Sequence, residues 1–248
     1  MDIVRICGGD YTQYEALLLR RDSLRKEALD YLSEYIRAFG ELTMEVYEQQ
    51  VKCIKLKKAI AFCQTAANYG RKPDRAQLEA YLEKEMAEYY QRLRQMADDN
   101  QNCKDAKAVP EHDVLRIKKI YRDIAKKLHP DISPLTEKYP ELLELWYRLV
   151  AAYNCNSLQE AQEVQLLINS FLERSGEDHF EITIPNINQR IADLEAEIRH
   201  IIATTPYTYK DLLNDPSAVE TKKETLREEL ETYRNYAEEL QKILDELC

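Results

Sequence analysis

The chain has 248 residues, of which 32% are charged, with a net charge of −10 and only 5 glycines and 8 prolines. So few turn residues exclude a β-sandwich or β-barrel of this length, because such folds need a turn about every 8 to 12 residues. The acidic balance makes nucleic acid and anionic membranes poor partners, and no apolar run approaches the roughly 20 residues of a membrane helix.

Apolar residues recur at steps of three and four along most of the chain, and this periodicity predicts an all-α protein of long helices. The predicted helices cover residues 11–69, 74–100, 113–129, 141–153, 157–173, 187–204 and 217–247. We expect three consecutive domains. They are an N-terminal long-helix hairpin over 1–104, a central helical domain over 105–174, and a linker with a C-terminal antiparallel coiled-coil hairpin over 175–248.

The N-terminal domain is expected to be an antiparallel coiled coil. Its apolar stripe keeps heptad spacing from Leu32 to Ala67, and Gly40 is the only helix breaker inside it. Gly70 followed by Pro73 signals the end of one helix and the start of the next. A short turn between two striped helices favours antiparallel pairing.

The C-terminal domain carries two further heptad helices, joined by a loop around Pro206. The short loop favours a hairpin within one chain. The alternative is a parallel coiled coil between two chains, which would make a homodimer. The polar stretches 98–112 and 175–185 are expected to be linkers, and Phe180–Ile184 alternates apolar and polar residues as an extended segment does.

The central domain begins with a basic helix. Its apolar side carries Ile117, Ile120, Ile124 and Leu128. Residues 116–128 hold six basic side chains and one acidic side chain, a basic island in an acidic protein. Lys118, Arg122 and Lys126 stack at positions i, i+4 and i+8. This stripe is either a docking surface for an acidic partner or an ordinary solvated face.

The basic helix is expected to end at an exposed corner. Pro130 lacks an N–H and disfavours helix at the residue before it, so the helix should end near His129. His129 and Asp131 would then project from the corner. The alternative is that these three residues form only a helix cap and a turn, since His suits a helix C-terminus and Asp starts turns.

The next predicted helix carries the pattern aromatic-x-x-aliphatic-x-x-Ala-Tyr, in Trp146, Leu149, Ala152 and Tyr153. The basic helix leads into His-Pro-Asp without a gap through Ile117-Lys118-Lys119, Tyr121-Arg122 and Ile124-Ala125. In this order the two patterns resemble helices II and III of the J domain of DnaJ-type co-chaperones, in a divergent, bacterial-type form. The resemblance covers the central domain alone.

The resemblance implies a function in protein–protein interaction. The basic face would dock on an acidic surface of a DnaK-type (70-kDa heat-shock) chaperone, and the His-Pro-Asp corner would stimulate its ATPase. The implied partner-binding residues are Lys118, Tyr121, Arg122, Lys126, His129, Pro130 and Asp131. The chain departs from the family where the short first helix, the final basic helix and the Gly/Phe-rich segment would be. These departures bear on activity more than on fold.

Other function classes find less support. No Gly-rich phosphate loop and no nucleophile with a base at motif spacing is present, so no enzyme activity, catalytic residue or cofactor is predicted. The six cysteines form no CxxC pair and no zinc-spaced cluster, so we predict no metal site and expect core thiols in a reducing cytosol. The N-terminus lacks signal-peptide features, and a cytoplasmic location is expected. The alternative functions are a coiled-coil scaffold in which the J-like hairpin is only structural, and an adaptor whose arms recognise an unknown client protein.

Overall fold

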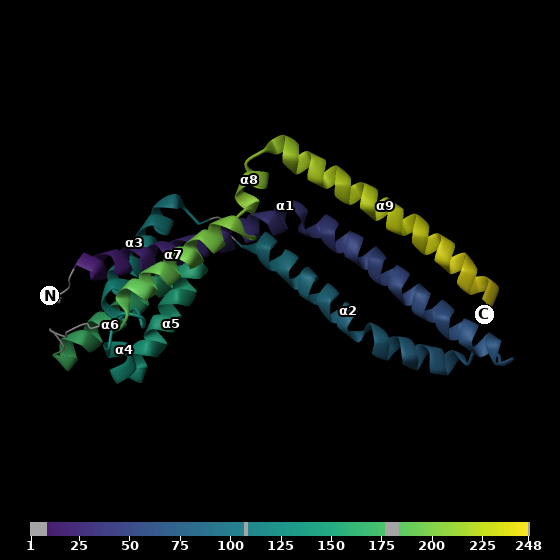
Figure 1. Cartoon of the computed structure of the whole chain (residues 1–248), viewed down its shortest axis with the longest axis horizontal. Coiled ribbons are helices and arrows are strands. Elements are labelled where there is room, and N and C mark those ends of the chain that lie inside the picture. The colour runs from purple at the N-terminus through teal and green to yellow at the C-terminus, as the bar shows by residue number, and fades with distance from the viewer. Residues whose placement is uncertain (1–8, 107–108, 177–183, 248) are drawn as a thin grey trace. The chain divides into compact units, whose positions relative to one another are not determined.

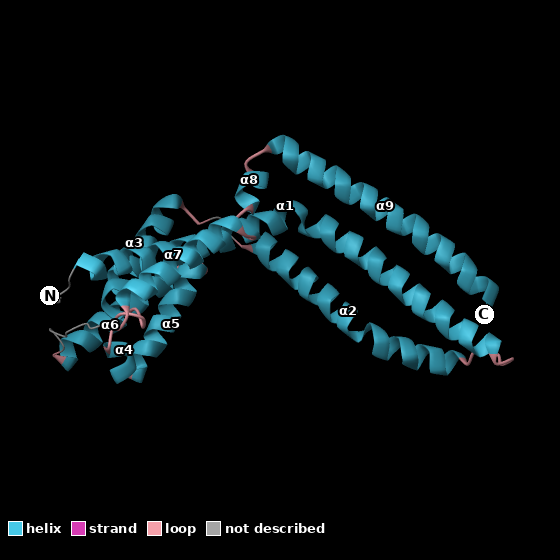
Figure 2. Ribbon diagram, in the orientation of Figure 1, coloured by secondary structure: helices cyan, strands magenta, loops and turns pink. Residues whose placement is uncertain are grey.

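The computed structural model describes residues 9–106, 109–176 and 184–247. Within these residues the protein is all-α, with nine helices and no strand, so the predicted fold class is confirmed (Figures 1 and 2). The helices are α1 (Gly9–Asn68), α2 (Arg75–Asp105), α3 (Glu111–Leu128), α4 (Leu135–Lys138), α5 (Pro140–Asn154), α6 (Leu158–Ser175), α7 (Ile187–Ala203), α8 (Tyr209–Leu213) and α9 (Pro216–Leu247). Among the residues that the structure describes, no helix is long and apolar enough to cross a membrane.

The predicted helix boundaries differ from the structure mainly in the polar stretches. Helix α2 continues to Asp105, through the first half of the stretch 98–112 that was expected to be a linker. Its start is fixed by Asp74, whose side chain accepts a hydrogen bond from the backbone N–H of Ala76 at 2.9 Å. The extended segment predicted over Phe180–Ile184 lies outside the described residues except for its last position.

Contacts divide the chain into two compact units rather than three consecutive domains. The first unit comprises residues 1–31 and 107–208, and the second comprises 32–106 and 209–248. Each unit is therefore built from two separate segments, and α1 contributes to both. The predicted boundary between 174 and 175 is absent because α6 and α7 belong to the same unit.

The second unit contains the predicted N-terminal hairpin, and its two helices are antiparallel. Phe62 of α1 stacks on Tyr81 of α2, with ring centroids 5.5 Å apart. At the far end of the pair, Arg37 Nε donates a hydrogen bond to the carbonyl of Cys103 at 2.8 Å. Residue numbers rise along one helix as they fall along the other.

Helix α9 packs on α1 and runs parallel to it. One apolar cluster joins Phe39 and Val46 of α1 to Leu226 and Leu230 of α9. Further along, a second cluster joins Cys53, Leu56 and Ile60 to Ala237 and Leu240. Residue numbers rise together on the two helices, which defines the parallel direction.

The predicted C-terminal hairpin, in which 187–204 would face 217–247, is corrected by these contacts. The apolar stripe of α7 lies in the first unit, where Ile191 and Leu194 cluster with Tyr11, Tyr14 and Leu18 of α1. The stripe of α9 is buried on α1 in the second unit. Helices α7 and α9 each have a single apolar stripe, and each buries that stripe against α1. No apolar stripe is then left for α7 and α9 to pair with each other.

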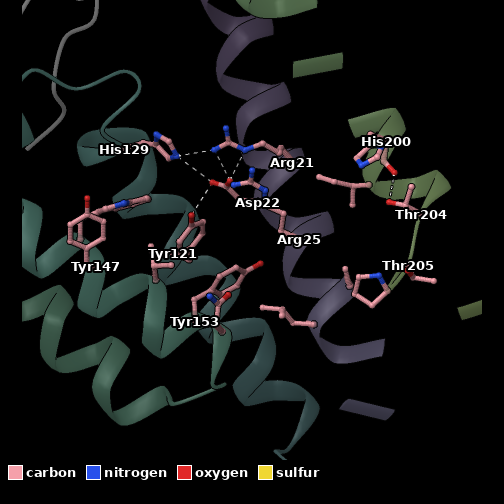
Figure 3. A pocket seen from close by; sticks show the side chains of 17 residues that line it. Arg21, Asp22, Arg25, Tyr121, His129, Tyr147, Tyr153, His200, Thr204 and Thr205 are labelled. Carbon is pink, nitrogen blue, oxygen red and sulfur yellow. Dashed lines mark hydrogen bonds and ion pairs between the residues drawn. The ribbon is translucent and has the colours of Figure 1, made fainter. Parts of the chain in front are cut away.

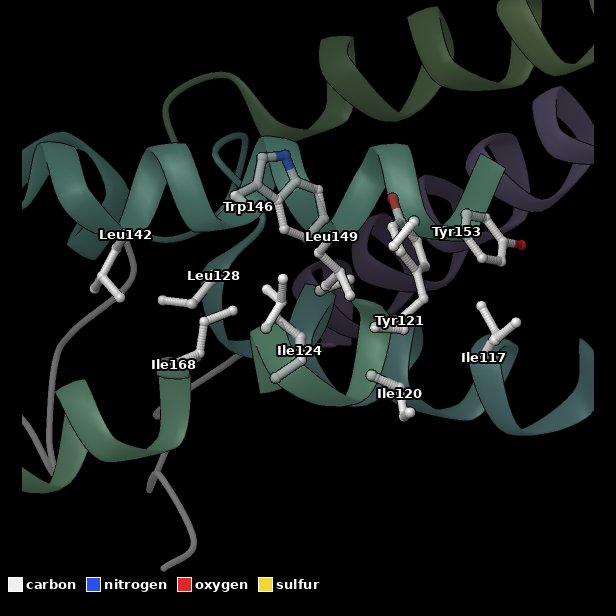
Figure 4. Close-up of a cluster of buried hydrophobic side chains, with 14 of the residues drawn as sticks. Ile117, Ile120, Tyr121, Ile124, Leu128, Leu142, Trp146, Leu149, Tyr153 and Ile168 are labelled. Atoms are coloured by element: carbon white, nitrogen blue, oxygen red, sulfur yellow. The ribbon is translucent and has the colours of Figure 1, made fainter. Parts of the chain in front are cut away.

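The core of the first unit is formed by α3, α5 and α6 (Figure 4). The apolar side of the basic helix faces α5, with Leu128 and Leu149 fully buried and Trp146 4% exposed. Helix α6 closes the cluster with Ala161, Val164 and Ile168. The aromatic pattern on α5 is therefore part of the core.

The cysteines only partly follow the expectation of free core thiols. Cys53 is free and buried. Cys155 is free but exposed, and Cys63 is buried and disulfide-bonded, so both depart from the expectation. Periodicity places a cysteine on a helix face, but it carries no information about which thiols meet across the fold.

Candidate functional site

The His-Pro-Asp segment forms a tight turn at the end of α3. His129 is the C-cap, and its backbone N–H donates to the carbonyl of Ala125 at 2.9 Å. The carbonyl of His129 then accepts hydrogen bonds from the N–H groups of Ile132 at 3.0 Å and Ser133 at 2.9 Å. The backbone N–H of Asp131 donates to Nδ1 of His129 at 3.1 Å. These bonds fix the turn from within.

His129 is buried, which corrects the expectation that it projects from an exposed corner. Its residue is 6% exposed, and its ring lies edge-on against Trp146 with centroids 4.9 Å apart. Because Nδ1 accepts the Asp131 N–H, we assign the ring proton of the neutral form to Nε2. That N–H points toward Oδ2 of Asp22, 3.4 Å away. Of the three residues of the turn, Pro130 and Asp131 are exposed.

Asp22 of α1 is the centre of a buried polar network (Figure 3). Its side chain is 10% exposed and accepts hydrogen bonds from the Tyr121 hydroxyl at 2.9 Å and from Arg21 Nη2 at 2.9 Å. Burial alone would raise the pKa of this carboxyl, but the hydrogen bond from His129 and the charge of Arg21 outweigh it and hold the pKa below its usual value. Burial, reinforced by the neighbouring Asp22 charge, raises the pKa of the Tyr121 hydroxyl. The network therefore contains an ionised aspartate and a neutral tyrosine.

Arg21 connects this network to the exposed Asp131. Its guanidinium is 11% exposed and approaches Asp131 Oδ2 at 3.5 Å and Glu197 Oε2 of α7 at 3.8 Å. The Asp131 side chain is 43% exposed, so water reaches one side of the carboxylate. The charge that was expected to be available to a partner is thus already shared with an arginine of the same chain.

The basic stripe of α3 also faces α1. Lys118 Nζ lies 3.9 Å from Glu27 Oε1, and Lys126 Nζ lies 3.8 Å from Glu15 Oε1. Arg122 is exposed and forms no ion pair with a described residue. Two of the three cations of the stripe therefore have a carboxylate of the same chain nearby, and Arg122 is the most available cation.

A cavity of about 640 Å³ adjoins the network (Figure 3). Its polar wall includes Arg21, Asp22 and His129, and its aromatic wall includes Tyr147 and Tyr153. The hydroxyl groups on its wall belong to Thr204, Thr205 and tyrosines. Among the described residues, no group of three or more His, Cys, Asp or Glu side chains is arranged to hold a metal ion.

The seven predicted site residues thus fall into three groups. Arg122, Lys126, Pro130 and Asp131 are exposed, Lys118 is half-buried, and Tyr121 and His129 are buried. Arg21 and Asp22 are not among the predicted site residues, although they contact the site from 99 to 110 positions away in the chain. No local sequence pattern identifies them, because helical spacing indicates which residues share a face of a helix but not which other element packs against that face.

Comparison of the chain with known protein families, curated proteins and solved structures finds no match. The resemblance to a J domain therefore rests on the motif residues alone.

Proposed function

We propose that the chain is a J-domain-like co-chaperone, which docks on a DnaK-type chaperone and stimulates its ATPase through the turn His129-Pro130-Asp131. The observation that carries the proposal is an exposed carboxylate, Asp131, at the end of a helix that also presents the exposed cations Arg122 and Lys126. The compartment that we propose is the cytoplasm, and the client protein would be recognised elsewhere on the chain.

The physical basis is electrostatic recognition. Basic side chains on α3 steer an acidic partner into place, and this steering raises the association rate more than the final affinity. The exposed side of Asp131 can then accept a charge-assisted hydrogen bond from an arginine of the partner. The partner would have to compete with Arg21, which already lies 3.5 Å from Asp131. No bond is made or broken on this chain.

The test is steady-state ATP hydrolysis by a DnaK-type chaperone with and without the protein. The wild-type chain should raise the rate, and Asp131→Asn should remove the rise. Asp123→Asn is the matched control, because Asp123 is also exposed, lies on α3 and changes the net charge equally. Equal loss in both variants would show a general charge effect and would contradict the assigned role of Asp131.

A second candidate is the scaffold in which the turn is only structural. The observation that favours it is the burial of His129, which closes the turn, packs on Trp146 and faces Asp22. The two candidates differ at Asp131. In a scaffold Asp131 acts only through its backbone N–H and its ion pair with Arg21, so Asp131→Asn would then leave the fold intact and change no chaperone rate.

A further inference from the structure

A hollow of about 470 Å³ lies between α1 and α3, apart from the cavity beside Asp22. Its residues come from both helices. They are Ala16, Leu19, Arg20, Ser23, Leu24 and Glu27 of α1, with Arg122 and Lys126 of α3. Ala16, Leu19 and Leu24 give it an apolar part, and the longer charged side chains surround that part.

Arg20 faces this hollow while its neighbour Arg21 faces the buried network. Consecutive residues of an α-helix are about 100° apart around its axis, so the two adjacent arginines project from different sides of α1. Ala16, Arg20, Leu24 and Glu27 follow each other at steps of four, four and three on one side of α1. Arg20 is exposed and, like Arg122, forms no ion pair with a described residue.

The charges around the hollow do not balance. The cations are Arg20, Lys118, Arg122 and Lys126, and the facing carboxylates are Glu15 and Glu27. Four positive charges less two negative charges leave an excess of two. The two ion pairs are long, at 3.8 and 3.9 Å, so Glu15 and Glu27 neutralise the lysines only loosely. Because the whole chain has a net charge of −10, this local excess of positive charge distinguishes the hollow from the acidic remainder of the surface.

We infer that this hollow is a docking groove for an acidic segment of a partner protein. Carboxylates of the segment would pair with Arg20 and Arg122, and an apolar side chain beside them would cover Ala16, Leu19 and Leu24. The inference rests on the proposed function and extends it, because the docking surface then includes α1 and a residue, Arg20, outside the J-like motif. Nucleic acid and anionic membranes fit less well, since a long polyanion would also meet the acidic remainder of the chain.

The test measures binding of a fluorescein-labelled decapeptide of glutamate and leucine to the full-length chain by anisotropy at low salt. Arg20→Glu and Arg122→Glu should each weaken binding about tenfold, as expected for reversing one directly paired charge. Arg20→Lys should keep most of the affinity. The control is Arg199→Glu on α7, an exposed arginine of the same unit that changes the net charge equally and does not line the hollow. Helicity of every variant is compared by circular dichroism.

The outcomes separate this inference from the function on which it rests. Equal weakening by Arg20→Glu and Arg199→Glu, or no binding to the wild-type chain, would overturn the groove. Tighter binding of an oligothymidylate of equal charge would also overturn it, because the site would then recognise polyanions. If peptide binding depends on Arg20 but the protein stimulates no DnaK-type ATPase, the docking groove is supported and the proposed co-chaperone function is contradicted.

Discussion

Arg21 on α1 and Asp131 in the turn after α3 form an ion pair across 110 positions of the chain, with Nη1 and Oδ2 3.5 Å apart. The contact gives the trigger residue of the proposed co-chaperone a counter-charge from its own chain. It also places the first part of α1 among the determinants of the site. Two of the carboxylates beside Arg21, Asp22 and Asp131, differ in burial, and this difference sets the first prediction.

Arg21→Ala should reduce the free energy of unfolding by about 1 to 3 kcal/mol, because it removes a charged hydrogen-bond donor from the buried Asp22. Asp131→Asn should change it by no more than about 0.5 kcal/mol, since that carboxylate is half exposed. Chemical denaturation of both variants and of the double variant measures the coupling. We expect a coupling below about 1 kcal/mol. A larger value would show that Asp131 is held as a structural residue.

Acid should weaken the network through Asp22. The pKa of Asp22 is lower in the folded than in the unfolded chain, so its contribution to stability is fully present above the unfolded value of about 4 and is lost as the pH falls below it. The melting temperature of Asp22→Asn should be lower than that of the wild type at pH 7. The difference should shrink as the pH is lowered from 5 toward the folded pKa, below about 4. A difference that stays constant with pH would assign the effect to packing instead.

Gly40 should be intolerant of a side chain although it lies inside a continuous helix. A Cβ at this position would lie 2.0 Å from Oδ1 of Asn100 on α2, a residue that is itself buried. Gly40→Ala should therefore cost about 1 to 3 kcal/mol of overpacking, despite the better helix propensity of alanine. Adding Asn100→Ala should recover most of the loss. Thermal melts of Gly40→Ala and of the double variant test this prediction. A Gly40→Ala variant that is more stable than the wild type would show that α1 and α2 move apart easily at this position.

The fragment 187–248 should not fold alone. In the intact chain the stripes of α7 and α9 are buried on α1, and the fragment lacks that partner. Circular dichroism of the isolated fragment should show little helix at low concentration, because most helical stability in proteins comes from packing of the apolar face. Sedimentation of a stable helical monomer would mean that α7 and α9 pair as the hairpin that their apolar spacing predicts, and a stable dimer would support the alternative of pairing between chains.

The sequence predicts helices well here and tertiary pairing poorly, for a physical reason. Helix ends depend on neighbours in the chain, so Gly70, Pro73 and Asp74 suffice to mark the passage from α1 to α2. A heptad stripe states only that one face is apolar. It does not say whether α9 buries that face on α7, on α1 or on a second chain.

The candidate site can likewise be predicted from the sequence only in part. The basic stripe and the turn at Pro130 follow from local spacing, and the structure has both. The burial of His129 could not be predicted, because it depends on Asp22 and Trp146 arriving from other helices. The partner-binding role of Tyr121 is affected most, since its hydroxyl is committed to Asp22.

The most direct test of the co-chaperone proposal is single-turnover hydrolysis of ATP held by a DnaK-type chaperone, at saturating amounts of this protein. If Asp131 is the trigger, the wild-type chain and Asp123→Asn accelerate hydrolysis, Asp131→Asn does not, and all three proteins have the same helicity. No acceleration by the wild-type chain, or equal acceleration by Asp131→Asn, would contradict the proposal and favour the scaffold.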